Sequence, residues 1–375
     1  MILSTSVDYF TSHMIDRSTD QRRRKALLIF SMAVNLGVLG FFKYFNFFIK
    51  SAEKVLEMLG LQATWPLLYI ILPVGISFYT FESMSYTIDV YRGTLKPTKK
   101  FLDYALFIAY FPHLVAGPIN RAHDFIPQIV KPRKVTTQLF VSGVTLILIG
   151  LFRKVVIADA IGPHVDEIFA NPGGHSSPEL IMGVYLFALQ IYCDFAGYTD
   201  IARGSSRLFG IEMMRNFNQP YFSASITEFW RRWHISLSTW LRDYLYIPLG
   251  GNRKGRIRTY VNLMITMLLG GLWHGAAWNF VIWGGLQGAF LIVDHLLGVQ
   301  VPKYPEATKF KWDWRRIAGV AITLQLVMLS WIFFPLVWAW VFAAVYPYAV
   351  FVHRYGNLAT GCAGNSDSVV ARPCD

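Results

Sequence analysis

The sequence predicts an all-α protein that forms a polytopic transmembrane helical bundle with re-entrant segments, and three observations carry this prediction. Charged residues make up only 15% of the 375 residues, against about 25% in an ordinary soluble domain. Hydrophobic residues reach 54% and aromatic residues 16%, so few polar side chains remain to cover a surface in water. The charges are also gathered between long uncharged runs, which is typical of membrane segments.

The uncharged runs define the expected membrane segments. They are residues 26–42, 58–81, 104–120, 136–152, 180–193, 259–293 and 317–352. A helix crosses the hydrocarbon in about 20 residues, so the run at 259–293 can hold two short crossings or a hairpin, and about seven to nine segments follow. We therefore expect a polar N-terminal segment at 1–25, a transmembrane domain at 26–352 and a disordered tail at 353–375 that is rich in Gly, Ser and Asn.

The net charge of +12 comes from basic clusters at the ends of the uncharged runs. Lys and Arg at such positions mark cytoplasmic loops that meet anionic lipid headgroups, so a nucleic-acid partner is not expected. The run at 104–120 lies between basic clusters at 92–100 and 131–134 and is interrupted by Pro112 and Pro118. It is too short to cross and return, so we expect a re-entrant segment buried in protein or beside a wet cavity.

His274 is the first candidate for a catalytic residue. It lies in the middle of the 259–293 run, among Gly270, Gly271 and Gly275, and both ends of that run are basic. An ionisable group deep in a membrane is costly and suggests function. A neutral imidazole there could take a proton from a hydroxyl and return it, as acyl transfer to an alcohol requires. The alternative is a core histidine bonded to a carbonyl of a neighbouring helix.

Residues 225–244 form the second candidate region. Ser225 with Glu228 three residues later predicts a capping box and a helix start. On one continuous helix, Glu228 could pair with an arginine, and His234 would share a face with residues four positions away on either side. The arginines Arg231, Arg232 and Arg242 could then anchor the phosphates of an acyl carrier. The alternative is an amphipathic helix at the membrane surface.

Other polar residues in apolar surroundings are weaker candidates, and each fits a structural role as well. They are Asp194, Asp200, Glu82, Asp89 and His113. Cys193, Cys362 and Cys374 have no spacing typical of a metal site, so no metal is expected. The absence of GxSxG, P-loop, HExxH and GxGxxG motifs removes the usual support for hydrolase, NTPase, zincin and dinucleotide-binding functions.

Several longer motifs occur in an order that resembles the membrane-bound O-acyltransferase (MBOAT) family, within the bacterial branch that acetylates exopolysaccharides such as alginate. The motifs are residues 42–44, 72–78, 111–113, 116–118, 194–198, 216–221, 230–234, 250–253 and 271–276. The resemblance implies a helical bundle with a central tunnel where two histidines meet. It makes His274 the catalytic histidine and His234 the second functional histidine.

The same resemblance implies acyl transfer from a cytoplasmic thioester donor, such as acetyl-CoA, to an extracytoplasmic acceptor, with no tightly bound cofactor. Donor or substrate binding is assigned to Arg231, Arg232, Arg242, Asn252, Arg253, Trp273 and Asn279. The expected partners are extracytoplasmic acetyl-transfer proteins, the polysaccharide synthesis machinery and the lipid bilayer of a bacterial cytoplasmic (inner) membrane.

Two departures from the family pattern stand at the ends of the chain. Met1 opens almost directly on the region of Asp8, where the family has preceding helices, and Phe334 is followed by Pro335 instead of an Arg-Ala pair. We therefore expect a chain that is truncated or altered at both ends and retains both histidine motifs.

Four alternative functions stay open at this point. Within the same class they are peptidoglycan O-acetylation and teichoic acid D-alanylation. From other classes they are a transporter or channel that uses buried His and Asp residues, and an inactive membrane scaffold.

Overall fold

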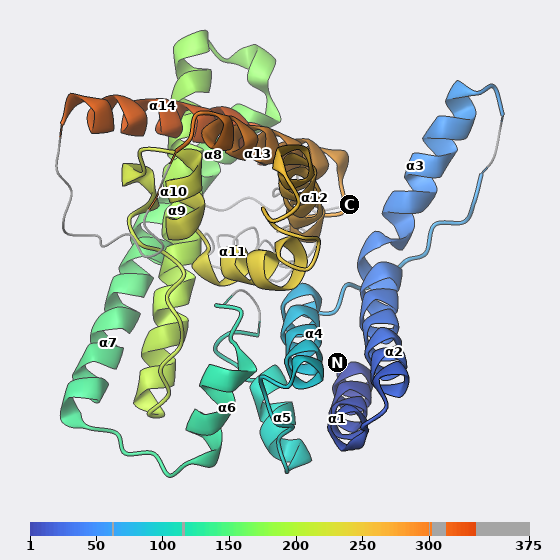
Figure 1. The fold of residues 1–375 in the computed structure, drawn as a ribbon. Coiled ribbons are helices and arrows are strands. Elements are labelled where there is room, and N and C mark those ends of the chain that lie inside the picture. The colour runs from blue at the N-terminus through green and yellow to red at the C-terminus, as the bar shows by residue number, and fades with distance from the viewer. Residues whose placement is uncertain (62–63, 115–116, 300, 302–312, 335–375) are drawn as a thin grey trace, which may run out of the picture.

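The computed structural model describes residues 1–61, 64–114, 117–299, 301 and 313–334, and over these residues the chain is helical and has no strand (Figure 1). The elements are α1 (Ile2–Arg17), α2 (Gln21–Leu39), η1 (Gly40–Tyr44), α3 (Phe45–Met58), α4 (Ile76–Arg92), α5 (Phe101–Ile108), α6 (Ala122–Val130), α7 (Thr137–Leu151), η2 (Phe152–Ala158), α8 (Asp159–Ala170), η3 (Pro172–Gly174), α9 (Ser177–Leu208), η4 (Pro220–Phe222), α10 (Ile226–Arg232), α11 (Ile235–Leu241), η5 (Arg242–Tyr246), α12 (Arg256–His274), α13 (Trp278–Leu296) and α14 (Trp314–Trp331). The predicted all-α class is confirmed. The predicted tail at 353–375 and the second half of the 317–352 run lie outside the described residues.

Within the described residues, three continuous helical stretches are long and apolar enough to cross a membrane. They are Gln21–Met58 with 38 residues, Thr137–Ala170 with 34 and Ser177–Leu208 with 32, and each overlaps one of the predicted runs. The 259–293 run forms a helical hairpin, because α12 and α13 have 19 residues each and are joined by a three-residue turn. The total number of crossings and the central tunnel stay predictions.

The predicted helical segment at 58–81 is wrong over most of its length. α3 ends at Met58 and α4 begins at Ile76, and the described residues between them contain no helix. Pro73 cannot donate a backbone hydrogen bond, and Gly75 has a φ of 74°. A Cβ on Gly75 would lie 2.0 Å from the Leu114 carbonyl oxygen, so the turn that starts α4 requires glycine both for its conformation and for space.

Glycines bring α7 and α9 into close contact. Gly143 of α7 faces Gly204 of α9, and Gly150 of α7 faces Gly197 of α9. Within each helix, the two glycines are seven residues apart. A Cβ at any of the four would lie 2.5 to 2.9 Å from a backbone oxygen of the opposite helix. Small residues that let backbones approach are a common basis of helix association in lipid. These two helices therefore form a rigid wall beside the rest of the molecule.

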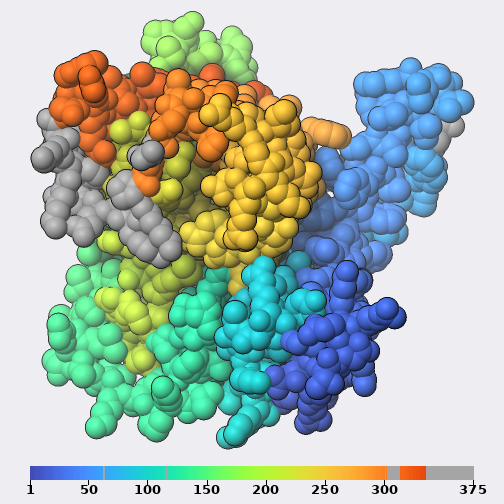
Figure 2. All heavy atoms as spheres, in the orientation of Figure 1, coloured from blue at the N-terminus to red at the C-terminus, as the bar shows by residue number. Residues whose placement is uncertain are grey.

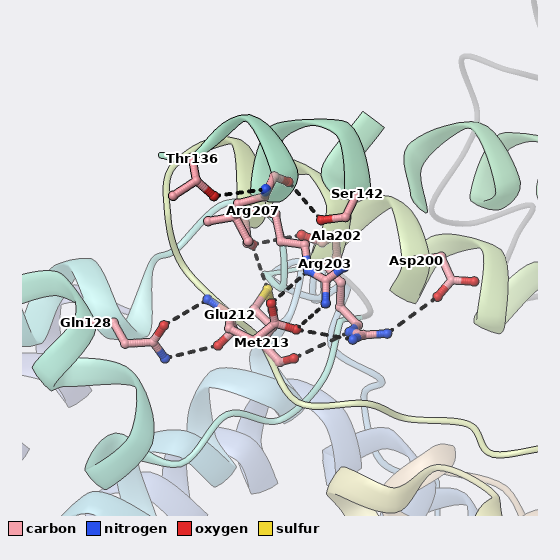
Figure 3. Close-up of polar contacts among 11 residues, drawn as sticks. Gln128, Thr136, Ser142, Asp200, Ala202, Arg203, Arg207, Glu212 and Met213 are labelled. Atoms are coloured by element: carbon pink, nitrogen blue, oxygen red, sulfur yellow. Dashed lines mark hydrogen bonds and ion pairs between the residues drawn. The ribbon is translucent and has the colours of Figure 1, made fainter. Parts of the chain in front are cut away.

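A polar cluster fixes the segment that leads from α9 to α10 (Figure 3). The Glu212 carboxylate accepts hydrogen bonds from Arg207 at 2.7 Å and Arg203 at 3.3 Å, both on α9. Its backbone N–H donates to the Gln128 side chain of α6 at 2.8 Å, and Gln128 donates back to the Glu212 carbonyl at 3.0 Å. The segment after α9 is thus anchored to two helices before it reaches the candidate site.

The predicted re-entrant segment at 104–120 leaves helical structure after α5. His113 and Asn120 are almost fully buried, and His113 lies 3.0 Å from the Glu82 carboxylate and 3.0 Å from the Asn120 amide. Its described irregular backbone is therefore held inside the protein, as the sequence predicts; its depth in a membrane stays a prediction.

Candidate active site

His274 is the last residue of α12, at the apex of the α12–α13 hairpin. The apex is tight because the helices are in backbone contact: a Cβ on Gly271 would lie 2.2 Å from the Phe280 carbonyl oxygen. A Cβ on Gly275 would lie 1.9 Å from the Phe280 ring. The glycines noted around His274 in the sequence therefore set how closely the two helices approach and where the imidazole lies.

A π-helical turn holds the end of α12. Tyr44 donates its hydroxyl hydrogen to the Leu272 carbonyl at 2.8 Å, and the Lys43 ammonium donates to the Trp273 carbonyl and to the Ser77 hydroxyl. Both residues lie on η1. The last carbonyls of a helix have no partner within the helix, so η1 satisfies two of them and fixes the hairpin apex.

His234 lies at a break between two helices, so the predicted continuous helix through residues 225–244 is wrong. α10 ends at Arg232, Trp233 is extended, and His234 has a φ of 43°, in the left-handed region. α11 then begins at Ile235. A side chain other than glycine in this conformation costs of order 1–3 kcal/mol, and such strain is concentrated at functional sites.

Backbone partners from a distant segment stabilise this break. The Ile235 N–H donates to the Asn216 carbonyl at 2.9 Å, and the Asn218 N–H donates to the Arg232 carbonyl at 2.9 Å. The Ser236 N–H donates to the Asn216 side chain at 3.2 Å. Groups that would have paired within one helix are thereby satisfied, and the segment anchored by Glu212 positions His234.

The two histidines face each other in an aromatic chamber. Their ring centroids are 6.2 Å apart with the ring planes at 61°. The Phe195 ring packs edge-on against His234 at 4.6 Å. The rings that contact His274 are Trp273 at 5.0 Å, Trp283 at 5.2 Å and Phe334 at 5.5 Å. The structure therefore brings together residues that are 40 positions apart in the sequence.

His234 has a nitrogen available for a ligand. The residue is 1% exposed, and its Nδ1 atom has no hydrogen-bond partner among the described residues. A buried polar atom without a partner is costly in a native structure and calls for an explanation. The His234 ring lies in the same chamber as the His274 ring.

The predicted helix start at Ser225 is confirmed. The Ser225 hydroxyl accepts the Glu228 N–H at 3.1 Å, and the Glu228 carboxylate reaches back to the Ala224 N–H at 2.9 Å, one residue earlier than a capping box requires. The same carboxylate pairs with Arg232 at 2.9 Å and with Arg316 of α14 at 3.0 Å. Glu228 thus ties α10 to α14.

The other predicted binding residues lie at different depths. Arg232 is fully buried, and in addition to Glu228 it donates to the Asn218 carbonyl at 3.0 Å, which gives it a structural role. Arg231 donates to the Val301 carbonyl, and Arg242 forms a two-point pair with Asp243 at 2.7 and 3.2 Å.

The remaining predicted binding residues differ in how far they are buried. Trp273 lies in the chamber wall, and Asn279 is partly buried in the first turn of α13. Asn252 and Arg253 are exposed in the loop before α12.

The acidic residues of α9 are held in ion pairs. Asp194 lies 2.5 Å from Lys154, and Asp200 pairs with Arg153, both on η2. These contacts support the structural interpretation for both carboxylates, because they link α9 to the π-helical end of α7 in apolar surroundings.

Lys43, Tyr44 and Asn216 also belong to the site, although no chemical pattern in the sequence points to them. The signal for Lys43 was its position at the end of the first uncharged run, where a charge is typical of a loop. π-helical turns are common at functional sites, but nothing in the sequence alone indicates that turn.

The structure therefore defines a helical membrane protein with two facing histidines in an aromatic chamber. The model of the MBOAT, membrane-bound O-acyltransferase family, matches residues 98–338, more than half of the chain. The chain belongs to this family.

Curated relatives cover most of the chain. It is 46% identical over 316 residues to a probable alginate O-acetylase AlgI of Pseudomonas aeruginosa, which is 84% of this chain and 58% of that protein. It is 35% identical over 361 residues to a peptidoglycan O-acetyltransferase of Helicobacter pylori, 89% of this chain and 66% of that protein. It is 30% identical over 276 residues to a teichoic acid D-alanyltransferase of Bacillus subtilis, 70% of this chain and 68% of that protein. The chain thus spans less than two thirds of the length of the alginate O-acetylase.

Proposed function

We propose that the protein is an O-acetyltransferase of the bacterial inner membrane that modifies an extracytoplasmic polysaccharide. The observation that carries the proposal is the meeting of His234 and His274, one of which has a buried nitrogen without a partner among the described residues. Family membership and the 46% identity to an alginate O-acetylase support this reaction class.

In the proposed mechanism, His274 acts as the general base. It takes the proton from an acceptor hydroxyl, whose oxygen attacks the acetyl carbonyl of a thioester. The C–S bond breaks, the thiolate leaves with the proton that His274 returns, and the acetyl group is joined to the acceptor by an ester bond. His234 donates a hydrogen bond to the developing oxyanion or to the acceptor from the opposite side of the chamber.

We propose that the acyl donor is a cytoplasmic thioester such as acetyl-CoA, anchored by Arg231 and Arg242. Arg231 lies in the last turn of α10 and Arg242 is the first residue of η5, at the two ends of the segment that carries His234. Paired guanidinium groups suit a phosphate because each can donate two parallel hydrogen bonds. Asn252, Arg253 and Asn279 are further proposed contacts.

Among acceptors, a polysaccharide like the one acetylated by the alginate O-acetylases is favoured over peptidoglycan and teichoic acid. The identity to the peptidoglycan and teichoic acid enzymes is 35% and 30%, against 46% for the alginate enzyme. We propose that extracytoplasmic acetyl-transfer proteins and the polysaccharide synthesis machinery act with this chain.

The test is the acetyl-ester content of surface polysaccharide in cells that lack the protein. Restoring the wild-type chain should restore the esters, and His274→Ala should not, at equal abundance in the membrane. The matched control is His295→Ala, which changes an exposed histidine at the end of α13. Esters that persist without the protein, or that His274→Ala restores in full, would contradict the proposal.

A further inference from the structure

A cavity of about 540 Å³ lies beside the hairpin apex, within the range of about 300–1,000 Å³ that ligand sites occupy. Its wall is formed on one side by Lys43, Asn46, Phe47, Lys50, Ser51 and Lys54, and on the other by Ala276, Ala277 and Trp278. We name this cavity the lysine groove. Its lining contains three ammonium groups and no carboxylate. In the space-filling view, the blue atoms of α3 stand out from the body of the molecule (Figure 2).

The lysines of the groove follow from helical spacing. Lys43, Lys50 and Lys54 are seven and four residues apart, so they lie on one face of the continuous η1–α3 stretch. Lys54 pairs with Glu57 at 2.8 Å, but both side chains are more than 60% exposed, and such pairs contribute only about 0–1 kcal/mol. Lys50 forms no ion pair within the part of the chain that the structure describes. Both ammonium groups are therefore available to an anionic ligand.

The inner end of the groove reaches the candidate active site. Lys43 lines the groove and donates to the Trp273 carbonyl, and Ala276 lies two residues after His274. A ligand held by Lys50 and Lys54 would therefore extend along η1 towards the hairpin apex that carries the catalytic histidine.

The position of the groove along α2 and α3 favours the acceptor over the donor. The basic cluster at 22–25 lies at the start of α2 and is expected at the cytoplasmic side. From Lys25 to Lys50 the helical stretch rises about 37 Å at 1.5 Å per residue, which exceeds the about 30 Å of the hydrocarbon core. From this orientation we expect Lys50 and Lys54 at the opposite, extracytoplasmic side, away from a cytoplasmic thioester.

We propose that the lysine groove binds the carboxylates of an acidic polysaccharide acceptor and presents a nearby hydroxyl to His274. This proposal rests on the proposed function, because it assigns the acceptor class to the same site. Lys50 and Lys54 hold successive carboxylates by charge-assisted hydrogen bonds. Lys43 keeps its hydrogen bond to the Trp273 carbonyl at the hairpin apex.

The test measures binding of a short oligouronate and of a neutral oligosaccharide of equal length to the purified full chain in lipid nanodiscs. We expect the oligouronate to bind and the neutral sugar not to bind. The double variant Lys50→Gln/Lys54→Gln should weaken oligouronate binding about 10- to 30-fold, since each lysine near a charged surface contributes about 1 kcal/mol. Lys50→Arg/Lys54→Arg should restore most of the affinity, which separates loss of charge from loss of folding.

The matched control is Lys131→Gln/Lys134→Gln, which removes two exposed lysines from another basic cluster and should leave binding unchanged. Equal binding of the neutral sugar, or unchanged affinity in the Lys50→Gln/Lys54→Gln variant, would overturn the proposal. Lysine-dependent binding of CoA without binding of the oligouronate would assign the groove to the donor and overturn it as well. If the chain lacks acetyltransferase activity but binds the oligouronate through these lysines, the proposed function fails and the groove assignment stands.

Discussion

The substitution Gly271→Ala tests how closely the hairpin must pack for the active site to form. The new methyl carbon would lie 2.2 Å from the Phe280 carbonyl oxygen and 3.1 Å from the Gly284 Cα atom. A carbon and an oxygen in favourable contact are about 3.3–3.6 Å apart, so the helices must separate by about 1 Å. Because His274 is three residues further along α12, it should move by a similar amount.

Two effects of this substitution can be separated. Overpacking typically costs about 1–3 kcal/mol, while Ala in a helix is about 0.8–1 kcal/mol more favourable than Gly. The free energy of unfolding should therefore fall by about 0–2 kcal/mol. A displacement of about 1 Å can cost about 100-fold in rate, so acetyl transfer should fall far more than stability.

The matched control for this prediction is Gly285→Ala in the facing helix. A Cβ there would lie 3.5 Å from a methyl group of Leu268, an ordinary contact, so activity should stay within about twofold of wild type and stability should rise by up to about 1 kcal/mol. The assay is acetyl transfer by purified protein, with melting temperature in the same detergent. Wild-type activity in Gly271→Ala, or an equal loss in both variants, would refute the reasoning.

Two further predictions concern stability. Burial raises the pKa of the Asp8 carboxyl to about 6, so the protonated form stabilises the fold below about pH 4, and this contribution is lost as the pH rises through 6. Asp8→Asn should make the melting temperature less dependent on pH between pH 4 and 7. An unchanged pH dependence of the melting temperature would contradict its attribution to Asp8. Glu228→Gln should cost about 3 kcal/mol, because Arg232 is then a buried charge without its carboxylate. The control Glu57→Gln removes only an exposed pair with Lys54 and should change the free energy of unfolding by less than about 1 kcal/mol. Similar losses of stability in Glu228→Gln and Glu57→Gln would contradict the prediction that the buried pair stabilises the fold more than the exposed pair.

The sequence was sufficient to predict that the 259–293 run can form a hairpin with His274 near its middle. The uncharged run and the glycines on either side of the histidine are local features, and a tight apolar hairpin follows from them. The start of α10 at Ser225 was equally local, because a capping serine acts on the N–H groups of the next few residues.

The break at His234 could not be predicted from local pattern. The apolar spacing through residues 225–244 fits one helix. A break at His234 becomes favourable only because Asn216 and Asn218 supply hydrogen bonds to the freed backbone groups. Those partners are 14 to 20 residues away in the sequence, and their contacts appear only when the chain is folded. Tertiary contacts of this kind override local helix propensity.

The role of Lys43 was hidden for the same reason. A lysine at the end of an apolar run is usually a loop residue, but η1 continues α2 into α3 and directs the ammonium to a carbonyl 230 positions further along the chain. In contrast, the error at 58–81 had local signals, because Pro73 and Gly75 both disfavour a helix there. Hydropathy alone does not distinguish a buried helix from an apolar irregular segment.

The central claim is that His234 and His274 act together in one acetyl transfer. The most direct measurement is a double-mutant cycle in purified protein, with the rate of acetyl transfer from labelled acetyl-CoA measured for wild type, His234→Ala, His274→Ala and the double variant. Each single variant should lose about 100- to 10,000-fold, and the double variant should lose little more than His274→Ala alone, because residues that act as a unit are not additive. Losses that multiply in the double variant, or a His274→Ala rate near wild type, would contradict the account.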